Sequence, residues 1–202
     1  IPNLELFESK KDLENVFSSW DIISGDVKTS ENILIYDEAG DHAAMQSAEI
    51  AIEQGSNVSF MTPDRLISSE IMGMNLTPYL KNLQNKNISF LIARRLLDVS
   101  ITGNKLNALI GSDYDESFKY HSTYDQVFVN YGTKPLDELY FQLLPYSKNE
   151  GELDYDKFID GYEQNIIKNI DKKFSIFRIG DAVSSRNIHA AIYDALRLVI
   201  NI

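Results

Sequence analysis

The fold is decided by residues 32–61, which read NILIYDEAGDHAAMQSAEIAIEQGSNVSFM. The first six form an apolar run with β-branched and aromatic side chains, which predicts a buried strand over 32–37. Small and apolar residues then follow at helical spacing from Ala43 to Ile52, and Gly55 is placed to end that helix. A second apolar run predicts a strand over 57–61. Strand, helix and strand make a βαβ unit, whose right-handed crossover leaves the two strands parallel.

The segment after this unit begins with Thr62-Pro63, an N-cap residue followed by proline at the first helical position. Apolar spacing continues to Leu83 and predicts a helix. Gly73 and Pro78 interrupt the pattern, so we expect two helical pieces rather than one.

Strand patterns dominate the next stretch. Three runs, 88–93, 98–102 and 105–110, predict an antiparallel β-meander, because Gly103-Asn104 has the chemistry of a hairpin turn. A further strand is expected over 124–130. Residues 31–133 are therefore predicted to form one Rossmann-like α/β domain with a β-ribbon insertion.

The two ends of the chain are less regular. Apolar spacing predicts a short amphipathic helix over 9–20, followed by a connector over 22–30. Loops and short helices are expected over 134–172, a strand over 174–179 and a helix over 187–199.

Composition excludes several classes of function. Of the 202 residues, 44% are hydrophobic, which is enough for an ordered core. A net charge of -11 disfavours nucleic acid and anionic membrane surfaces as partners, and no apolar run is long enough to cross a bilayer. The absence of cysteine excludes thiol nucleophiles, iron–sulfur clusters and disulfides within the chain, and it suits a reducing, cytoplasmic location. Three histidines leave little for a metal site, and no catalytic or metal-ligating residue is expected.

The turn at 37–42, DEAGDH, occupies the place where a dinucleotide fold carries a glycine-rich phosphate loop. Only Gly40 remains of that loop, and three carboxylates stand where a pyrophosphate would add negative charge. Two interpretations stay open: a weak NAD(H) site at Gly40, or a structural βαβ unit that has lost its site. The carboxylates favour the second, because desolvating them beside a pyrophosphate is unfavourable.

A second candidate site lies between the strand and helix near the C-terminus. Gly180-Asp181 forms a turn, and Arg186 and Asn187 stand at the helix start. Such groups hydrogen-bond ribose or ribityl hydroxyls and phosphates. The alternative is an ordinary N-capped helix after a Gly-Asp turn.

Three blocks in this order resemble a known family: NILIYDEAGDHAAMQSAE (32–49), VFVNYGTKPLDELYF (127–141) and FRIGDAVSSRNIHAAIYDAL (177–196). They are similar to the C-terminal part of the large NADH:flavin oxidoreductases of the Old Yellow Enzyme type. That group includes trimethylamine and histamine dehydrogenases, 2,4-dienoyl-CoA reductase and demethylases of N-methylated substrates. The resemblance implies an N-terminal barrel with FMN and a 4Fe-4S cluster, neither of which this chain contains. We therefore expect the chain to be a fragment without chemistry of its own.

The same resemblance assigns three regions. Residues 1–30 would be a linker and short helix, 31–133 an NAD-type domain, and 134–202 the C-terminal part of an FAD- or ADP-type lobe whose first half lies upstream. Gly132 and Thr133 match the crossing between the domains, and Gly180-Asp181 matches the Gly-Asp that contacts FAD, or ADP in its place.

Expected partners follow from the resemblance as well. They are the missing barrel, an electron-transfer protein and further copies of the parent enzyme. The competing hypothesis is a non-catalytic docking module, in which the acidic surface and the tyrosine-rich segment 140–155 contact a protein partner.

Overall fold

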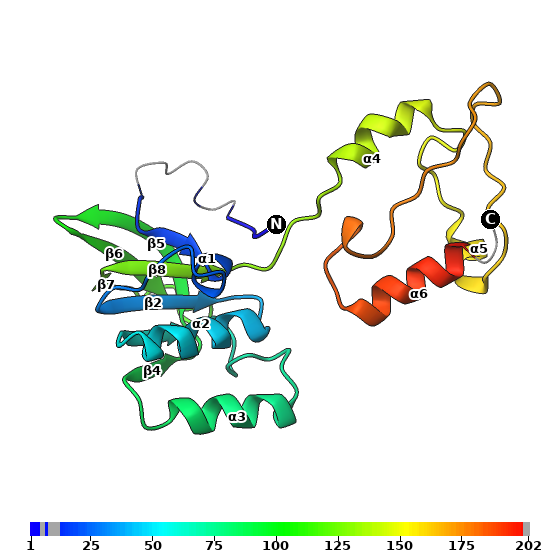
Figure 1. Ribbon diagram of the computed structural model, residues 1–202. Coiled ribbons are helices and arrows are strands. Elements are labelled where there is room, and N and C mark those ends of the chain that lie inside the picture. Colours follow the sequence, from blue (N-terminus) through cyan, green and yellow to red (C-terminus); the bar gives the residue numbers. More distant parts are fainter. Residues whose placement is uncertain (5–6, 8–12, 200–202) are drawn as a thin grey trace. The chain divides into compact units, whose positions relative to one another are not determined.

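The computed structural model describes residues 1–4, 7 and 13–199. They form two compact units, Pro2–Gly132 and Thr133–Ile202, the second joined by Ile1 (Figure 1). Each unit is described by itself below.

The first unit is built on a five-stranded parallel sheet with the strand order β1-β8-β2-β3-β4. Its strands are β1 Val16–Ser18, β8 Gln126–Asn130, β2 Asn32–Asp37, β3 Asn57–Met61 and β4 Ile88–Leu91. Its helices are α1 Ser19–Ile23, α2 His42–Glu53 and α3 Gly73–Leu83. A separate antiparallel meander consists of β5 Arg95–Thr102, β6 Lys105–Gly111 and β7 Tyr120–Tyr124.

Alternate residues of the parallel strands serve two different cores. Ile33 and Ile35 of β2 are buried in the core that includes α2, whereas Leu34 and Tyr36 are buried in the core that includes the meander. This alternation follows from the two-residue period of a strand and gives three layers: helices, parallel sheet and meander. The predicted Rossmann-like α/β fold class with an antiparallel meander is confirmed.

The βαβ unit has the predicted limits. β2 and β3 pair in parallel with Asn32 opposite Asn57, and Gly55 has a φ of +94° just beyond α2. The unit folds as its local pattern indicates because most of the buried strand residues are apolar and the helix carries small residues toward the sheet.

The helix expected from Pro63 is wrong over its first ten residues. Residues 62–72 form turns, Ser68 has a φ of +48°, and α3 begins only at Gly73. The turns are held by a tertiary contact, because the amide of Glu70 donates to the carbonyl of Gly40. Pro78 lies inside α3 without dividing it.

Two strand assignments also differ from prediction. The run 88–93 was expected in the meander, but β4 pairs in parallel with β3. α3 supplies the crossover that brings it back parallel, a connection that an apolar run alone cannot reveal. The third meander strand is instead β7, whose polar sequence YHSTY gives no strand pattern.

At the N-terminus, the helix predicted over 9–20 is wrong over 13–18, and its first four residues, 9–12, lie outside the described residues. Val16–Ser18 is β1, which extends the sheet beside β8. Ser18 caps α1 through a capping box with Asp21, so the helix starts at Ser19.

The second unit contains short helices joined by irregular chain, as predicted over 134–172. They are α4 Glu138–Leu143, η2 Leu144–Tyr146, α5 Tyr155–Asp160, η3 Gly180–Ala182 and α6 Ile188–Val199. The predicted helix near the C-terminus is confirmed as α6. The strand predicted over 174–179 is wrong: the backbone of Ile176 bonds the side chain of Asn149 rather than a neighbouring strand.

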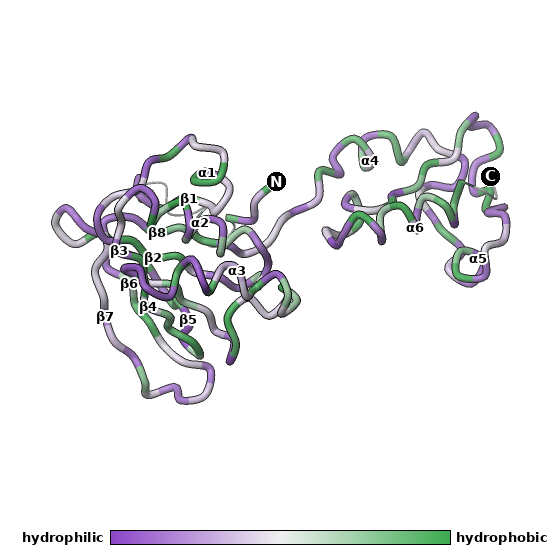
Figure 2. Tube along the Cα trace, turned by 60° about the horizontal axis from the view of Figure 1, so that its bottom comes forward, coloured by the Kyte–Doolittle hydropathy of each residue, from purple (hydrophilic) through white to green (hydrophobic). Residues whose placement is uncertain are grey.

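Hydrophobic residues are distributed unequally between the units, although hydrophobic segments run through both (Figure 2). Of the described hydrophobic side chains between Thr133 and Val199, Leu198 is the one that is buried, whereas 17 large ones are exposed. A self-sufficient core is therefore present in the first unit and lacking in the second.

No helix within 1–4, 7 and 13–199 is both long and apolar enough to span a membrane.

Candidate nucleotide sites

The N-terminus of α2 is the end of the first unit at which a Rossmann fold holds a pyrophosphate. Asp41 is the N-cap of this helix, and its carboxylate accepts a hydrogen bond of 3.0 Å from the amide of Ala43. A protein carboxylate thus occupies the position that a bound anion would need.

A second carboxylate, that of Asp37, belongs to the same turn. Asp37 ends β2 with 0% of its surface exposed, and its Oδ1 accepts from the Gly40 amide at 2.9 Å. Asn130, at the end of β8, donates to Oδ1 of both Asp37, at 3.0 Å, and Asp41, at 2.8 Å. The Oδ2 atom of Asp37 is buried without a hydrogen-bond partner. Burial raises the pKa of Asp37 to about 6, against the hydrogen bonds from Gly40 and Asn130, which lower it.

Gly40 itself faces protein rather than open space. It has a φ of +70°, and a Cβ at this position would lie 2.7 Å from Oγ of Ser69. Its carbonyl accepts from the Glu70 amide at 3.0 Å. The turn segment 62–72 therefore covers the place where a phosphate loop would approach its ligand.

The backbone amides of Glu38 and Ala39 and the Glu38 carboxylate also have partners within the protein. The amides of Glu38 and Ala39 both donate to the carbonyl of Asn130. The Glu38 carboxylate is paired with Arg95 at 2.7 Å, and Arg95 also makes two hydrogen bonds to Asp113. These hydrogen bonds, that to Asp113 foremost, hold the pKa of the Arg95 guanidinium above its ordinary value.

The first unit therefore does not fit a bound dinucleotide at this turn. Four backbone amides, those of Glu38, Ala39, Gly40 and Ala43, are bonded to protein oxygens. A pyrophosphate would also meet the carboxylates of Asp37 and Asp41. The sequence predicted the carboxylates but missed Asn130 and Arg95, which reach the turn from β8 and β5.

The two residues predicted at the domain crossing fall in different units. Gly132 has a φ of +77° and lies near the Ala39 side chain, so it borders the same turn. Thr133 begins the second unit.

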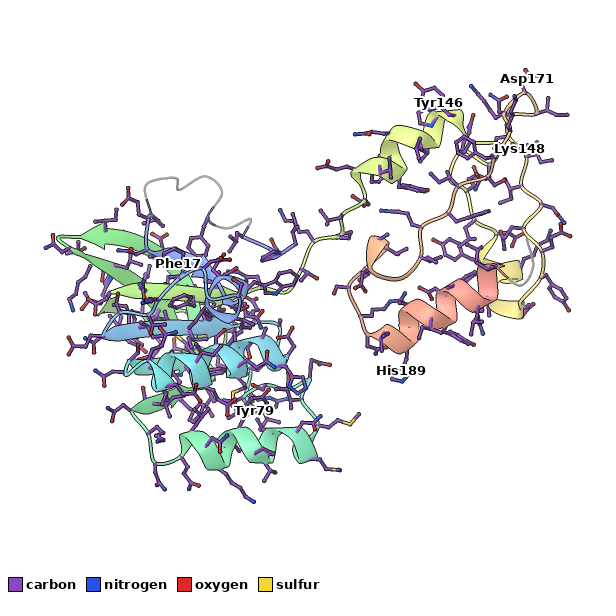
Figure 3. All side chains as sticks on the ribbon, viewed as in Figure 1. Phe17, Tyr79, Tyr146, Lys148, Asp171 and His189 are labelled. Atoms are coloured by element: carbon purple, nitrogen blue, oxygen red, sulfur yellow. The ribbon has the colours of Figure 1, made fainter. Side chains whose placement is uncertain are left out.

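The His42 side chain contacts α3 rather than the Gly40 turn. Its ring nitrogen Nδ1 lies 3.1 Å from the hydroxyl of Tyr79, which α3 carries toward α2 (Figure 3). The pair joins two helices. No three His, Asp or Glu side chains converge as metal ligands anywhere in the described residues.

In the second unit, Gly180 is buried against α6. A Cβ on Gly180 would lie 2.9 Å from that of Ala191, and its φ is +55°. Its amide donates to Asp194 at 3.1 Å, and Arg186 pairs with the same carboxylate. Close packing of the turn on the helix therefore requires glycine here.

The other two predicted residues at this turn have different roles. Asn187 precedes α6, and its side-chain oxygen accepts from the Ala190 amide at 2.9 Å. Asp181 is exposed, and its carboxylate makes no hydrogen bond to the described part of the chain. Of Gly180, Asp181, Arg186 and Asn187, Asp181 is the one whose side chain is free to accept from a ligand hydroxyl.

A cavity of about 360 Å³ lies beside this turn, within the second unit. Arg186 and Ser184 form part of its wall, and four aromatic rings form much of the rest. The aromatic residues are Tyr140, Tyr155, Phe158 and Phe177.

Sequence comparison finds relatives of this chain among known enzymes. No protein-family model matches the chain. It is 51% identical over its full length to "Probable N-methylproline demethylase" of Rhizobium meliloti (strain 1021). It is 30% identical over 196 residues to "N,N-dimethylglycine/sarcosine dehydrogenase" of Chromohalobacter salexigens.

Solved structures share the fold at low sequence identity. A 6-hydroxypseudooxynicotine amine oxidase of Pseudomonas geniculata N1 matches 92% of the chain with a TM-score of 0.67 and 19% identity. A histamine dehydrogenase of Rhizobium sp. 4-9 matches 91% with a TM-score of 0.63 and 16% identity. The chain covers 24% and 25% of these two structures.

The chain spans 29% of the length of the N-methylproline demethylase and 28% of that of the sarcosine dehydrogenase. A third relative, 26% identical over 201 residues, is a multifunctional alkene reductase and demethylase of the Old Yellow Enzyme type from Caballeronia cordobensis. By sequence, the chain is therefore homologous to one region of the Old Yellow Enzyme-type demethylases and dehydrogenases and corresponds to less than a third of their length.

Proposed function

We propose that the chain is the C-terminal nucleotide-binding region of a larger flavin oxidoreductase that demethylates or dehydrogenates an N-methylated amino acid. The named activities of the relatives at 51% and 30% identity support this substrate class. The chain itself contributes no catalytic residue. A 4Fe-4S cluster would be held by the remainder of the enzyme, since this chain has no cysteine to ligate it. FMN would belong to the barrel that the family resemblance implies.

The observation that carries the proposal is the unsatisfied hydrophobic surface of the second unit. Ile188, Ile192, Leu196 and Val199 of α6 are each at least half exposed, and the unit has no strand among its described residues. A helix with this much apolar surface needs a sheet or helix to cover it. The homologues supply more than two thirds of their length outside the matched region, which is enough chain for that cover.

We assign an adenine nucleotide, FAD or ADP, to the lobe that the second unit would complete. Asp181 fits a role in accepting hydrogen bonds from ribose or ribityl hydroxyls, because its carboxylate is exposed and unbonded within the described chain. Arg186 lines the cavity wall, where an ion pair with Asp194 fixes its position. It therefore fits a supporting role in the site. Asn187 fits less well, because its oxygen caps α6.

The closed turn at Gly40 bears on which compound reduces the flavin of the whole enzyme. With no dinucleotide site at this turn, reduction of the flavin by NADH through the first unit is disfavoured. The proposal is then an enzyme reduced by its amine substrate and reoxidised by an electron-transfer protein, with the first unit as a scaffold.

A test compares amide hydrogen exchange over 133–199 in the whole enzyme and in the 202-residue chain. We expect the α6 amides to exchange slowly in the whole enzyme and fast in the chain alone. Equal protection in both would show that the second unit is complete by itself and would contradict the proposal.

The nucleotide is tested separately by acid extraction and chromatography of the purified whole enzyme. Asp181→Ala should lower the bound adenine nucleotide severalfold, whereas Asp160→Ala, an exposed carboxylate on α5 of the same unit, should leave it unchanged. Retention of full nucleotide by Asp181→Ala would remove Asp181 from the site.

The docking-module hypothesis uses the same exposed surface. Tyr146 and Tyr155 are 60% and 70% exposed, in the segment predicted to contact a protein partner. If that hypothesis holds, these side chains remain solvent-accessible in the whole enzyme, whereas completion of a nucleotide lobe predicts that α6 is covered. Slow exchange of the α6 amides in the whole enzyme would therefore support the nucleotide lobe, and fast exchange of these amides would favour the docking module.

A further inference from the structure

Residues 64–70 form a strap over the Gly40 turn. Pro63 and Ile71, which flank the strap, are buried and fix its two ends. In the described chain, one backbone hydrogen bond joins the strap to the turn: the Glu70 amide donates to the Gly40 carbonyl at 3.0 Å. The strap belongs wholly to the first unit, and a role for it does not depend on the function proposed above.

Two features of Ser68 make the closed position of the strap unfavourable. Its φ of +48° is a left-handed backbone conformation, which a residue with a Cβ adopts only at an energetic cost. Its hydroxyl oxygen is buried without a hydrogen-bond partner in the described part of the chain. A buried polar atom that lacks a partner destabilises the conformation that buries it. Local opening of the strap would relieve both costs.

The turn beneath the strap contains a second atom of this kind. Oδ2 of Asp37 is buried without a partner, while Oδ1 accepts from the Gly40 amide at 2.9 Å and from Asn130 at 3.0 Å. Gly40 connects the turn to the strap, because its amide donates to Asp37 and its carbonyl accepts from the strap. Asp37 Oδ2 and Ser68 Oγ are the two buried side-chain atoms of the described chain that have no partner.

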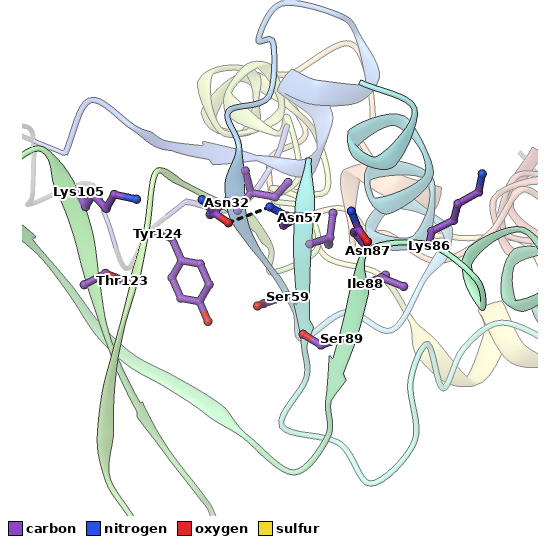
Figure 4. Close-up of a pocket in the computed structure, with 12 residues that line it drawn as sticks. Asn32, Asn57, Ser59, Lys86, Asn87, Ile88, Ser89, Lys105, Thr123 and Tyr124 are labelled. Carbon is purple, nitrogen blue, oxygen red and sulfur yellow. Dashed lines mark hydrogen bonds between the residues drawn. The ribbon is translucent and has the colours of Figure 1, made fainter. Parts of the chain in front are cut away.

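The opposite edge of the same sheet has no such atoms. An open polar groove of about 590 Å³ lies there, at the amino ends of β2, β3 and β4 (Figure 4). Within it, Asn57 donates to Asn32 at 3.1 Å. None of the polar side-chain atoms that line this groove in the described chain is both buried and unpartnered. Buried polar atoms without partners are thus confined to the Gly40 turn and the strap.

Electrostatic repulsion couples Asp37 to the strap. Two carboxylates act on Asp37: that of Asp41, the N-cap of α2, and that of Asp64, in the strap. The hydroxyl of Ser69, also in the strap, donates to the Asp64 carboxylate at 3.0 Å. β8 contributes a neutral group, the Asn130 amide. Ionised Asp37 therefore repels a charge that the strap carries, whereas protonated Asp37 does not.

The other titratable groups of the turn are engaged elsewhere. Arg95, the cation that reaches the turn, pairs with Glu38 at 2.7 Å and with Asp113 at 2.6 Å. The His42 ring lies 3.1 Å from the hydroxyl of Tyr79. These pairs leave the negative charge of ionised Asp37 without a cation of its own.

Closure of the strap is therefore linked to a proton. In the closed form the pKa of Asp37 is about 6, whereas opening admits water to the carboxyl group and returns its pKa toward 3.8. Because the closed form binds the proton more tightly, closure is favoured in acid and weakens as the pH rises through 6. A pKa difference of this size changes the opening equilibrium by up to about a hundredfold.

We propose that the strap is a proton-sensitive lid on the Gly40 turn, which stays shut when Asp37 is protonated and opens more often when Asp37 is ionised. Opening gives water access to Asp37 and releases the strained backbone of Ser68. The sheet stays folded, because Pro63 and Ile71 hold the two ends of the strap.

Amide hydrogen exchange of the full 202-residue chain, followed by nuclear magnetic resonance from pH 5 to 7.5, tests the lid. The reporter is the Glu70 amide, and a protection factor removes the intrinsic rise of exchange with pH. We expect this protection factor to fall by about five- to tenfold over the range. The control is the Gln54 amide, which bonds the Ile50 carbonyl at the same 3.0 Å near the end of α2. Its protection factor should change by less than about twofold.

Three variants separate the charges from the structure. Asp37→Asn keeps the shape of the protonated side chain and should hold the protection factor of the Glu70 amide at its acid value up to pH 7.5. Asp64→Asn removes the repelling charge from the strap and should raise that protection factor at pH 7.5 by about two- to fivefold. Glu70→Gln removes an exposed charge from the same strap, is the matched control and should leave the pH dependence unchanged. A dispersed spectrum verifies the fold of each variant.

Three results would overturn the proposal. The first is a protection factor of the Glu70 amide that is constant with pH. The second is a value equal to that of the β2 amides at every pH, since exchange would then require unfolding of the whole unit. The third is a pH dependence that persists in folded Asp37→Asn, because the titrating group would then be another residue.

Discussion

The side-chain amide of Asn130 lies 3.0 Å from Oδ1 of Asp37 and also bonds Oδ1 of Asp41 at 2.8 Å. One neutral amide at the end of β8 thus holds two carboxylates together at the helix end where a dinucleotide fold would bind phosphate. The contact both stabilises the turn and closes it to an anion.

Replacing Asn130 should destabilise the first unit. Asn130→Leu removes the donor shared by Asp37 and Asp41 and leaves a buried carboxylate with one hydrogen bond fewer, which costs about 2–3 kcal/mol. Urea unfolding of the chain, followed by tryptophan fluorescence or circular dichroism, measures this change. In Asn130→Asp the added charge should make the destabilisation larger at pH 7 than at pH 4. A neutral effect of both substitutions would show that the bridge is energetically unimportant.

Stability should depend on pH through Asp37. Its pKa is raised from 3.8 to about 6 in the folded state, so the folded protein binds the proton more tightly than the unfolded chain does. The stability that the protonated Asp37 adds to the folded state is fully present below pH 3.8 and is lost as the pH rises through 6. A shift of this size corresponds to about 3 kcal/mol.

Asp37→Asn isolates that contribution from the other carboxylates. The variant should match the wild-type free energy of unfolding near pH 4 and exceed it at pH 7. Parallel urea titrations at pH 4, 5, 6 and 7 give the difference curve. A difference that does not vary with pH would mean that Asp37 is ionised with an ordinary pKa.

Gly40→Ala should be more harmful than an alanine at another glycine with positive φ. Gly55→Ala is the matched control, since Gly55 has a φ of +94° with nothing within 4 Å of an added Cβ. At Gly40 the added Cβ would also approach Ser69 Oγ to 2.7 Å. We expect about 1 kcal/mol of destabilisation at Gly55 and about 1–2 kcal/mol more at Gly40. Equal values would indicate that segment 62–72 moves aside easily.

NADH should not bind the first unit. The turn amides are bonded to protein oxygens, and the carboxylates of Asp37 and Asp41 oppose a pyrophosphate. Calorimetric titration of the full chain at low salt is expected to give no saturable heat. Saturable binding that Gly40→Asp abolishes would restore a nicotinamide site and make the parent enzyme an NADH-dependent reductase.

Much of the first unit was predictable because its signals are local. The runs 33–36 and 60–61 are apolar, and the small-residue helix between the two strands is bounded by Asp41 and Gly55. The segments assigned wrongly are those whose state depends on a distant partner. Val16–Ser18 becomes a strand through β8, and residues 62–72 are held as turns by Gly40.

The sequence by itself determined the βαβ unit, the three carboxylates at its first turn and the likeness to one region of a larger oxidoreductase, because these rest on residue order and local periodicity. Only the tertiary structure decided that the turn is closed. Asn130, Arg95 and Ser69 reach it from other segments of the chain, and hydrogen bonding between distant segments leaves no pattern in the sequence.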